Sequence, residues 1–188
     1  MIVATSVGLA LGVQSAVAKP YQIPSASMLP TLEVGQRVVV DRVTYRFSEP
    51  EIGDVIVFNP PVGADQSHPH PCGAEPDPDQ ACAVPRPEQA SDTFIKRIVA
   101  GPGDRLSISR GHAILNGERA LEDFTVPCGS GSACDLTTEI TIPDDHFFVM
   151  GDNRGESFDS RAWGPVPRES IIGVARFTYW PMDRIGGL

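Results

Sequence analysis

Two serines in one short stretch are the first candidates for chemistry in this sequence. The stretch "IPSASMLPTL", residues 23–32, places Ser25 and Ser27 between two prolines. Proline fixes its own backbone torsion φ, so the flanking prolines restrict the chain between them. A serine hydroxyl is a weak nucleophile near neutral pH until a base accepts its proton. The pattern therefore predicts a stiff turn that presents a serine, and the base must come from elsewhere in the chain.

Histidine is the usual base, but the four histidines of this chain lie in poor positions for that role. His68 and His70 lie in the proline-rich stretch "SHPHP", His112 follows a turn glycine, and His146 begins a strand-like run. None of them has an orienting carboxylate in a rigid segment, so we interpret them as surface or loop residues. The i, i+2 spacing of the first pair could bind a metal ion, but a loop gives it no fixed geometry.

Lysine is the alternative base, and Lys96 has the right surroundings. It lies in "TFIKRIVAGPGD", where strand alternation puts it on one face with Phe94 and Ile98 and puts Arg97 on the other face. Burial disfavours the ammonium form and lowers the pKa of a lysine. A fall from about 10.4 to roughly 7–8 would make Lys96 a competent base. A buried lysine with a purely structural role is the other interpretation.

A third polar cluster follows in "MGDNRGESFDSRAWGPVP", residues 150–167. Phe158 and Trp163 are interleaved with its polar residues, which indicates a packed loop whose polar groups must be satisfied internally. Asp159 and Arg161 could form a charge-assisted pair, and Ser157 could donate to or accept from a buried amine.

The elements that must position these groups are predicted to be mostly strands joined by turns. Strands or hairpins are expected at residues 34–43, 53–61, 92–108, 112–120, 145–153 and 170–181. The run Val55–Phe58 is continuously apolar, so both of its faces should be buried. Asn116-Gly117 predicts a two-residue type I′ turn. Residues 62–91 and 122–139 are polar, turn-rich stretches that we expect to be irregular insertions.

Residues 2–18, "IVATSVGLALGVQSAVA", carry no charge and allow three interpretations. They could form a membrane anchor or the last part of one. They could be a cleavable signal peptide, since "AVA" at 16–18 has the small-x-small form of a cleavage site. They could also be a buried core helix. The first two interpretations imply that the rest of the chain is exported across the membrane.

Charge and cysteine content narrow the class of protein. A net charge of −9 and an isoelectric point near 4.8 argue against a nucleic-acid partner. The four cysteines fall into two close pairs, and neither pair has the spacing of a zinc site. They allow three pairings, of which we expect the local one, Cys72–Cys82 and Cys128–Cys134. Such disulfides imply an oxidising compartment, whereas four free thiols would suit a cytosolic protein.

Four segments together resemble the sequence boxes of bacterial type I signal peptidases. They are, in order, "PSASMLPTL", "GDVIVFNPP", "FIKRIVAGPGD" and "GDNRGESFDSRAWGPV". "PCGSGSAC" also resembles the small disulfide loop of Gram-negative members. The resemblance implies a mainly β fold: an antiparallel catalytic core like that of signal peptidases and the related self-cleaving repressors, with a reduced, loop-rich insertion and an N-terminal apolar helix. The chain would then divide into an apolar segment at 1–19 and an extracytoplasmic catalytic domain at 20–188.

The resemblance also implies roles for individual residues. Ser27 resembles the nucleophile and Lys96 the general base of a Ser-Lys endopeptidase. Ser25 resembles the serine whose hydroxyl completes the oxyanion hole together with the Ser27 backbone N–H. Ser157 resembles the serine that orients the lysine. No metal or cofactor is implied.

Further implications concern support, substrate and location. Asp159 and Arg161 resemble a supporting ion pair, and Met28 and Ile98 are candidates for lining the substrate pockets. The substrates implied are preproteins cleaved after small-x-small sites. The protein would be a monomer held in the bacterial inner membrane by residues 1–18, with its catalytic domain on the periplasmic face.

Three other functions compete with this interpretation. A peptidase that matures conjugation pilins would share the Ser-Lys chemistry, but the full "GDNRGESFDSRAWG" favours the general signal peptidase. A self-cleaving repressor would need a basic DNA-binding domain, which the sequence does not contain. A non-catalytic β-rich binding module would make the same polar residues structural.

Overall fold

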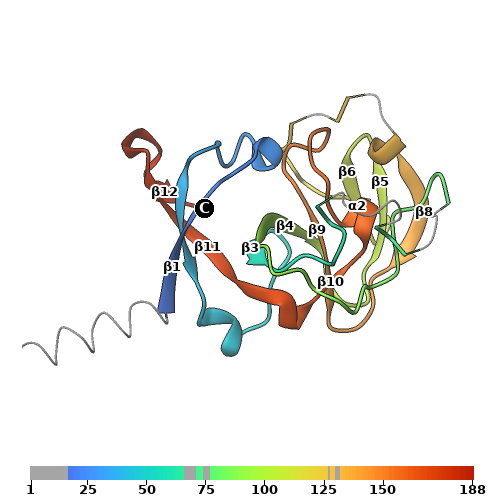
Figure 1. Ribbon diagram of the computed structural model, residues 1–188. Helices are drawn as coiled ribbons and strands as arrows, with labels where there is room; N and C mark the ends of the chain where they lie inside the picture. The colour runs from blue at the N-terminus through green and yellow to red at the C-terminus, as the bar shows by residue number, and fades with distance from the viewer. Residues whose placement is uncertain (1–16, 66–70, 74–76, 127, 130–131) are drawn as a thin grey trace, which may run out of the picture.

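The chain folds almost entirely into antiparallel strands (Figure 1). The computed structural model describes residues 17–65, 71–73, 77–126, 128–129 and 132–188. The strands are β1 (Ala18–Gln22), β2 (Arg37–Asp41), β3 (Val55–Phe58), β4 (Phe94–Ala100), β5 (Arg105–Ser109), β6 (His112–Leu115), β7 (Glu118–Arg119), β8 (Leu136–Thr141), β9 (His146–Met150), β10 (Val166–Pro167), β11 (Ile171–Trp180) and β12 (Gly186–Gly187). The predicted mainly β fold is therefore confirmed.

Helical structure is confined to short pieces among the described residues. They are the 3₁₀ turns η1 (Ala26–Met28), η2 (Thr44–Arg46), η3 (Ser132–Cys134), η4 (Arg168–Ser170) and η5 (Met182–Arg184) and the α-helix α2 (Ser160–Trp163). Two of these pieces, η1 and α2, lie in the serine stretch and in the third polar cluster. Both segments therefore form short helical turns that connect strands.

The strands form two sheets. An 8-stranded sheet has the order β1-β2-β11-β3-β4-β9-β10, with β12 paired to β11, and a 4-stranded sheet has the order β7-β6-β5-β8. In Figure 1 the smaller sheet lies at the far side of β9 from β1 and β2. The strands β3 and β4 are neighbours near the middle of the larger sheet.

The apolar run in β3 shows why this strand is central. Val55 and Val57 pack into one hydrophobic cluster with Met28 and Leu32, while Ile56 and Phe58 pack into another cluster with Trp163. All four residues of the strand are buried, as the continuous apolar run predicts. A third cluster, which includes Leu106, Ile108 and Phe148, joins the smaller sheet to the larger one.

The hairpin between β6 and β7 has the predicted turn. Asn116 and Gly117 both have positive φ, at 53° and 88°. A type I′ turn requires positive φ at both central positions, and Asn-Gly is the pair that reaches it most easily.

The structure corrects two details of the sequence prediction. Strand β1 was not predicted, and it already includes Ala18 and Lys19, so the sheet begins before the expected boundary at residue 19. The insertion expected at 122–139 is irregular only as far as Asp135, because β8 begins at Leu136. Residues of β8 alternate between more buried and exposed positions, as in an antiparallel sheet with one face in solvent. The polar composition of the strand conceals this alternation in the sequence.

The predicted N-terminal apolar helix lies almost wholly outside the described residues. In the part of the chain that the structure describes, no helix has the length and apolar character that crossing a bilayer requires. The irregular stretch at 62–91 is described in part, and its pairing there consists of isolated bridges such as Pro61 with Gln89.

The core around Phe58 supports a stability prediction. Phe58 is fully buried, with its ring centroid 6.5 Å from that of Phe94 and 6.0 Å from that of Trp163. Phe58→Ala should lower the free energy of unfolding by about 3–5 kcal/mol, because it leaves a cavity between two aromatic rings. Phe47→Ala is the matched control, since Phe47 is 85% exposed. Urea denaturation of both variants checks this, and equal losses would contradict it.

Candidate active site

The serine stretch forms a turn that is held from two sides. Ser27 lies in η1, and the backbone N–H of Asn153 donates to its carbonyl oxygen at 3.0 Å. The side-chain amide of Asn153 donates to the carbonyl oxygen of Ala26 at 3.2 Å. On the other side of the turn, Met28 is fully buried in the core. The sequence did not predict a role for Asn153, because its partners are backbone atoms more than a hundred residues away.

Lys96 lies in the middle of β4, opposite Ile56 of β3, and its side chain reaches this turn. Its Nζ is 2.6 Å from the Ser27 hydroxyl oxygen, and the hydrogen bond is buried. Lys96 is only 5% exposed and Ser27 only 7%. The structure thus brings the predicted serine and the predicted lysine together, out of water and within bonding distance.

Burial lowers the pKa of Lys96 from 10.5 to about 8, because removing the ammonium group from water disfavours its charge. The nearby carboxylates of Asp159 and Asp152 act in the opposite direction, and the Arg161 guanidinium assists the fall. A pKa of about 8 leaves about a tenth of the amine neutral at pH 7, whereas an unperturbed lysine would have less than about one part in a thousand neutral. A neutral amine has the lone pair that a base requires.

Ser25 places a second hydroxyl beside the first. Its oxygen is 3.2 Å from the Ser27 hydroxyl oxygen, and the residue is exposed where Ser27 is buried. An exposed hydroxyl beside a buried one is positioned to meet a molecule that approaches from solvent.

An ion pair on the other face of β4 fixes the strand to the turn and to the third polar cluster. Arg97 donates from Nε to Asp152 at 2.8 Å and from a terminal nitrogen to the second carboxylate oxygen at 2.7 Å. The Thr31 hydroxyl donates to the same carboxylate at 2.6 Å. Three segments that each carry a candidate residue are thus joined at one carboxylate. Sequence reasoning noted Asp152 as polar but missed this connection.

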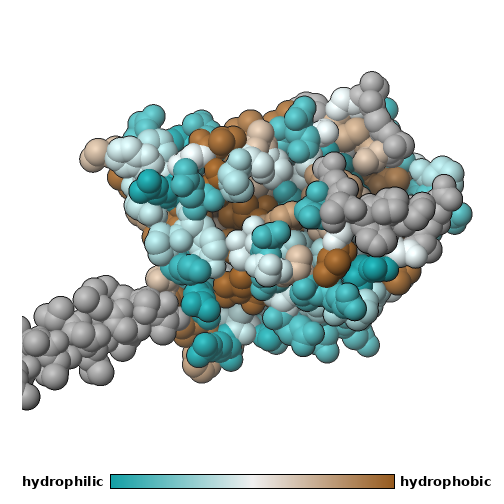
Figure 2. Space-filling model, in the orientation of Figure 1, coloured by the Kyte–Doolittle hydropathy of each residue, from teal (hydrophilic) through white to brown (hydrophobic). Residues whose placement is uncertain are grey.

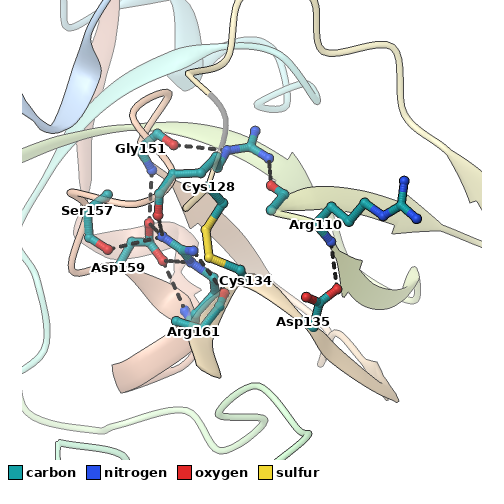
Figure 3. Close-up of a disulfide and its surroundings, with 11 residues drawn as sticks. Arg110, Cys128, Cys134, Asp135, Gly151, Ser157, Asp159 and Arg161 are labelled. Atoms are coloured by element: carbon teal, nitrogen blue, oxygen red, sulfur yellow. Dashed lines mark hydrogen bonds and ion pairs between the residues drawn. A yellow bond between two sulfur atoms is a disulfide. The ribbon is translucent and has the colours of Figure 1, made fainter. Parts of the chain in front are cut away.

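Asp159 and Arg161 form a buried, bidentate pair in α2 (Figure 3). Asp159 also accepts a hydrogen bond from the backbone N–H of Gly151 at 3.0 Å. Burial alone would raise the pKa of the Asp159 carboxyl, but Arg161 and the hydrogen bonds lower it, so the carboxylate stays charged. The pair therefore positions the loop that passes Ser27.

Gly151 is the point of closest approach in this loop. A Cβ atom added there would lie 2.4 Å from the Ser27 carbonyl oxygen and 2.3 Å from the Ser157 hydroxyl oxygen. A side chain at this position would push the loop away from the serine turn, so glycine is required by space.

The predicted hydrogen bond between Ser157 and Lys96 is absent from the structure. The Ser157 hydroxyl oxygen is buried and has no hydrogen-bond partner among the described residues. It lies close to Gly151, on the side where a Cβ atom would also meet the Ser27 carbonyl oxygen.

The Ser27 hydroxyl opens onto a cleft of about 460 Å³. Its lining residues are mostly apolar near the pair, with two acids among them: Tyr21, Gln22, Ile23, Pro24, Ser25, Ser27, Val57, Ala64, Asp65, Thr93, Phe94, Ile95, Lys96, Glu156 and Phe158. Figure 2 shows apolar surface exposed between hydrophilic rims in the middle of the molecule.

Met28 and Ile98 do not line this cleft, which corrects the sequence prediction. Both are fully buried, Met28 in the cluster with Leu32 and Ile98 in the cluster with Phe58 and Trp163. Adjacency in sequence to a catalytic candidate was misleading, because the 3₁₀ turn and the strand direct neighbouring side chains into the core.

Both local disulfides are formed, and both loops meet Arg161. Cys72 is bonded to Cys82 and Cys128 to Cys134. Arg161 donates to the carbonyl oxygen of Ala133 inside the second loop, and its own carbonyl oxygen accepts from the N–H of Cys82.

A second buried ion pair joins the polar cluster to the smaller sheet. Arg154 pairs with Glu122 at 2.6 Å and also donates to the carbonyl oxygens of Gly151 and Gly111. Figure 3 shows the Cys128–Cys134 bridge with the Asp159–Arg161 pair on one side and the hydrogen bond from the Arg110 backbone N–H to Asp135 on the other. Sequence reasoning missed Glu122, which looks like an ordinary loop acid.

The histidines that the structure describes lie elsewhere. His112 is 3.4 Å from Glu122, and His146 is hydrogen-bonded to the Asp144 carbonyl oxygen. Neither lines the cleft. His68 and His70 lie outside the described residues. Among those residues, no group of three or more His, Cys, Asp or Glu side chains could hold a metal ion.

The buried amine predicts a stability effect with a defined pH window. Lysine 96 is protonated more readily in the unfolded chain than in the native protein, so its burial destabilises the protein fully below pH 8. The penalty fades as pH rises from 8 to 10.5. Lys96→Met should therefore raise the free energy of unfolding at pH 7 by up to about 3 kcal/mol, less the lost hydrogen bond to Ser27. The gain should shrink toward pH 10.

Chemical denaturation of the variant and the parent protein at several pH values measures this difference. Lys19→Met is the matched control, because Lys19 is exposed. A gain that does not change with pH, or an equal gain in the control, would show that the Lys96 amine is not held at a lowered pKa.

Comparison with known proteins identifies a family and several similar proteins. The family model described as "Signal peptidase, peptidase S26" matches residues 1–180. Signal peptidase I of Leptolyngbya laminosa is 38% identical over 183 residues, which cover 97% of this chain and 79% of that protein. Probable signal peptidase I-2 of Synechocystis sp. is 35% identical over 182 residues, which cover 97% of this chain and 72% of that protein.

A plant protein is also similar. The probable thylakoidal processing peptidase 2, chloroplastic, of Arabidopsis thaliana is 38% identical over 186 residues. The match covers 98% of this chain but 44% of the plant protein, so the chain spans less than half of that relative. With a family model matched from residue 1 to residue 180, the chain belongs to the signal peptidase family, peptidase S26.

Proposed function

We propose that this protein is a serine endopeptidase of the signal peptidase I type, with Ser27 as nucleophile and Lys96 as general base. The observation that carries the proposal is the buried 2.6 Å contact between the Lys96 amine and the Ser27 hydroxyl. A structural lysine would be stabilised by a carboxylate partner or by water. Here burial lowers its pKa, and its hydrogen bond goes to a hydroxyl that opens onto a cleft.

The first half of the reaction is acylation of the serine. Neutral Lys96 accepts the proton of the Ser27 hydroxyl as the oxygen attacks the scissile carbonyl carbon. The resulting ammonium then donates a proton to the departing amine, so the new N-terminus leaves as a neutral group. The Ser27 oxygen is left bonded to the acyl part of the substrate.

The negative charge that develops on the carbonyl oxygen needs donors already in place. The Ser27 backbone N–H and the Ser25 hydroxyl supply them in this proposal. Asn153 supports the first donor, because its bonds to the Ala26 and Ser27 carbonyls fix the orientation of the turn. In the second half of the reaction, Lys96 activates a water molecule that hydrolyses the acyl-enzyme.

The substrate is an extended segment of an exported preprotein, cut after a small-x-small sequence. Strand β1 ends the larger sheet and has one partner, β2, among the described strands. From β1 the chain continues directly into Ile23–Ser25, which line the cleft. An extended peptide can pair with such a free edge through its backbone while small side chains enter the apolar cleft.

The location follows from the segment before β1 and from the disulfides. In the proposal residues 1–18 hold the enzyme, as a monomer, in the bacterial inner membrane, and the catalytic domain faces the periplasm. The two disulfides suit an oxidising compartment. The cleft then lies close to the bilayer, where the cleavage site of a translocated preprotein emerges.

Loss of the nucleophile tests the proposed function. Ser27→Ala should lower cleavage of a standard preprotein by at least about 10³-fold, because the variant lacks the hydroxyl that Lys96 contacts. Ser48→Ala, at an exposed serine, is the control and should leave cleavage unchanged. Unchanged cleavage by Ser27→Ala would favour a binding module, and cleavage of a pilin precursor alone would favour the pilin-maturing peptidase.

The dependence of activity on pH tests the base. The value of kcat/KM should fall tenfold per pH unit below about 8, because protonated Lys96 cannot accept the serine proton. A variant in which His68, His70, His112 and His146 are all replaced with Gln should show the same fall of kcat/KM at low pH. If the fall of kcat/KM at low pH disappears in the histidine variant, the base is a histidine.

A further inference from the structure

A second cavity, of about 370 Å³, lies on the surface away from the serine–lysine cleft. We call it the basic pocket. Its lining residues are Arg42, Tyr45, Arg46, Pro50, Arg168, Glu169, Ile171 and Ile172. Three arginines at one cavity are unexpected in a chain whose net charge is −9. The proposed peptidase reaction uses none of them.

One of the three arginines builds the wall of the pocket. Arg168 pairs with Glu49 at 2.7 Å and donates to the carbonyl oxygens of Tyr45 and Ser48. These bonds fix the turn that follows β2, and they engage Nε and one terminal nitrogen of Arg168, whose charge is paired with that of Glu49.

The other two arginines are free to bind a ligand. The side chains of Arg42 and Arg46 have no hydrogen bond or ion pair within the described part of the chain, and both residues are exposed. Both line the basic pocket, Arg42 from just before η2 and Arg46 from its last residue. Two guanidinium groups on one turn suit the oxygens of a phosphate group.

The acids close to this turn are mostly occupied. Both oxygens of Asp41 cap the turn, accepting from the backbone of Val43 and from Thr44. Glu49 is engaged by Arg168, which leaves Glu169 as the acid in the lining of the pocket. The free charge facing solvent at this turn is therefore positive.

The position of the pocket suggests what occupies it. The backbone N–H of Arg42 donates to the carbonyl oxygen of Val17 at 3.0 Å, so the pocket lies where the uncharged stretch 2–18 joins the domain. Phe47, next to Arg46, is 85% exposed. Figure 2 shows hydrophilic surface gathered near the start of the described chain. An exposed aromatic ring beside free arginines is the composition of a membrane-interface surface.

We propose that the basic pocket binds the phosphate of an anionic lipid headgroup through Arg42 and Arg46, an inference that rests on the membrane location proposed above. Binding there holds the start of β1 against the bilayer surface. The arginines supply charge and hydrogen bonds, and the wall built by Arg168 and Ile171 gives the headgroup a fixed place.

Sedimentation of the full chain with lipid vesicles tests the proposal. The unmodified protein should bind vesicles containing phosphatidylglycerol more tightly than vesicles of phosphatidylcholine alone. Arg42→Gln combined with Arg46→Gln should reduce this preference about 25-fold, roughly fivefold for each arginine near the surface. The control combines Arg110→Gln, in the turn between β5 and β6, with Arg119→Gln, in β7. This equal charge change at two exposed residues should change the preference less than about twofold.

Three outcomes would overturn the proposal. The unmodified protein could show no preference for phosphatidylglycerol. The control variant could lose as much of this preference as the pocket variant, which would indicate a diffuse charge effect. The pocket variant could keep the preference within about twofold of the parent protein, which would show that Arg42 and Arg46 do not hold the headgroup. Equal unfolding midpoints for the variants and the parent protein exclude a folding defect.

Two further measurements separate this proposal from the peptidase function. Cleavage of a short soluble peptide should be the same in the pocket variant and the parent protein. Ser27→Ala should keep the full preference for phosphatidylglycerol. If the parent protein cleaves nothing, the proposed function fails while the vesicle measurement still decides the fate of the pocket.

Discussion

A lysine amine held out of water against a single hydroxyl is the interaction on which this structure depends. Such an arrangement opposes folding, because a buried ammonium group loses its hydration. The protein maintains it with a surrounding frame that is rigid on every side. The central strand β4 fixes the Lys96 backbone between β3 and β9, and the clusters on both faces of β3 fix the strand. The same loss of hydration lowers the pKa of the amine, and in the proposed reaction this lowered pKa makes Lys96 a competent base.

The segment from residue 150 to 163 does most of the positioning, and it does so largely through backbone atoms. Asn153 holds the carbonyl oxygens of the serine turn, and Asp152 joins that turn to β4 through Arg97. Asp159 holds Gly151 where it passes the Ser27 carbonyl oxygen. Arg161 then connects these contacts to both disulfide loops. The disulfides close the loops that Arg161 contacts, which restricts the conformations of those loops.

Strand β1 connects the two sites proposed for this molecule. It starts at the turn that carries the basic pocket and leads into the residues that line the serine–lysine cleft. An extended strand rises about 3.3 Å per residue, so the five residues of β1 span about 17 Å. In the proposed arrangement, lipid contacts at the start of β1 would set the height of the cleft above the bilayer. A substrate leaving the membrane would then meet the cleft in an extended form.

The sequence by itself determined the β-rich fold, the buried strand β3 and the type I′ turn, because alternation, apolar runs and turn residues are local signals. It also indicated Ser27 and Lys96, since prolines around a serine and a lysine among apolar residues are unusual patterns. Only the tertiary structure decided what depends on contacts across the chain. Strand β1, Asn153, the Arg97–Asp152 bond and the Glu122–Arg154 pair have partners that no local pattern reveals. Met28 and Ile98 were misplaced for the same reason, because the direction of a side chain is set by packing against distant segments.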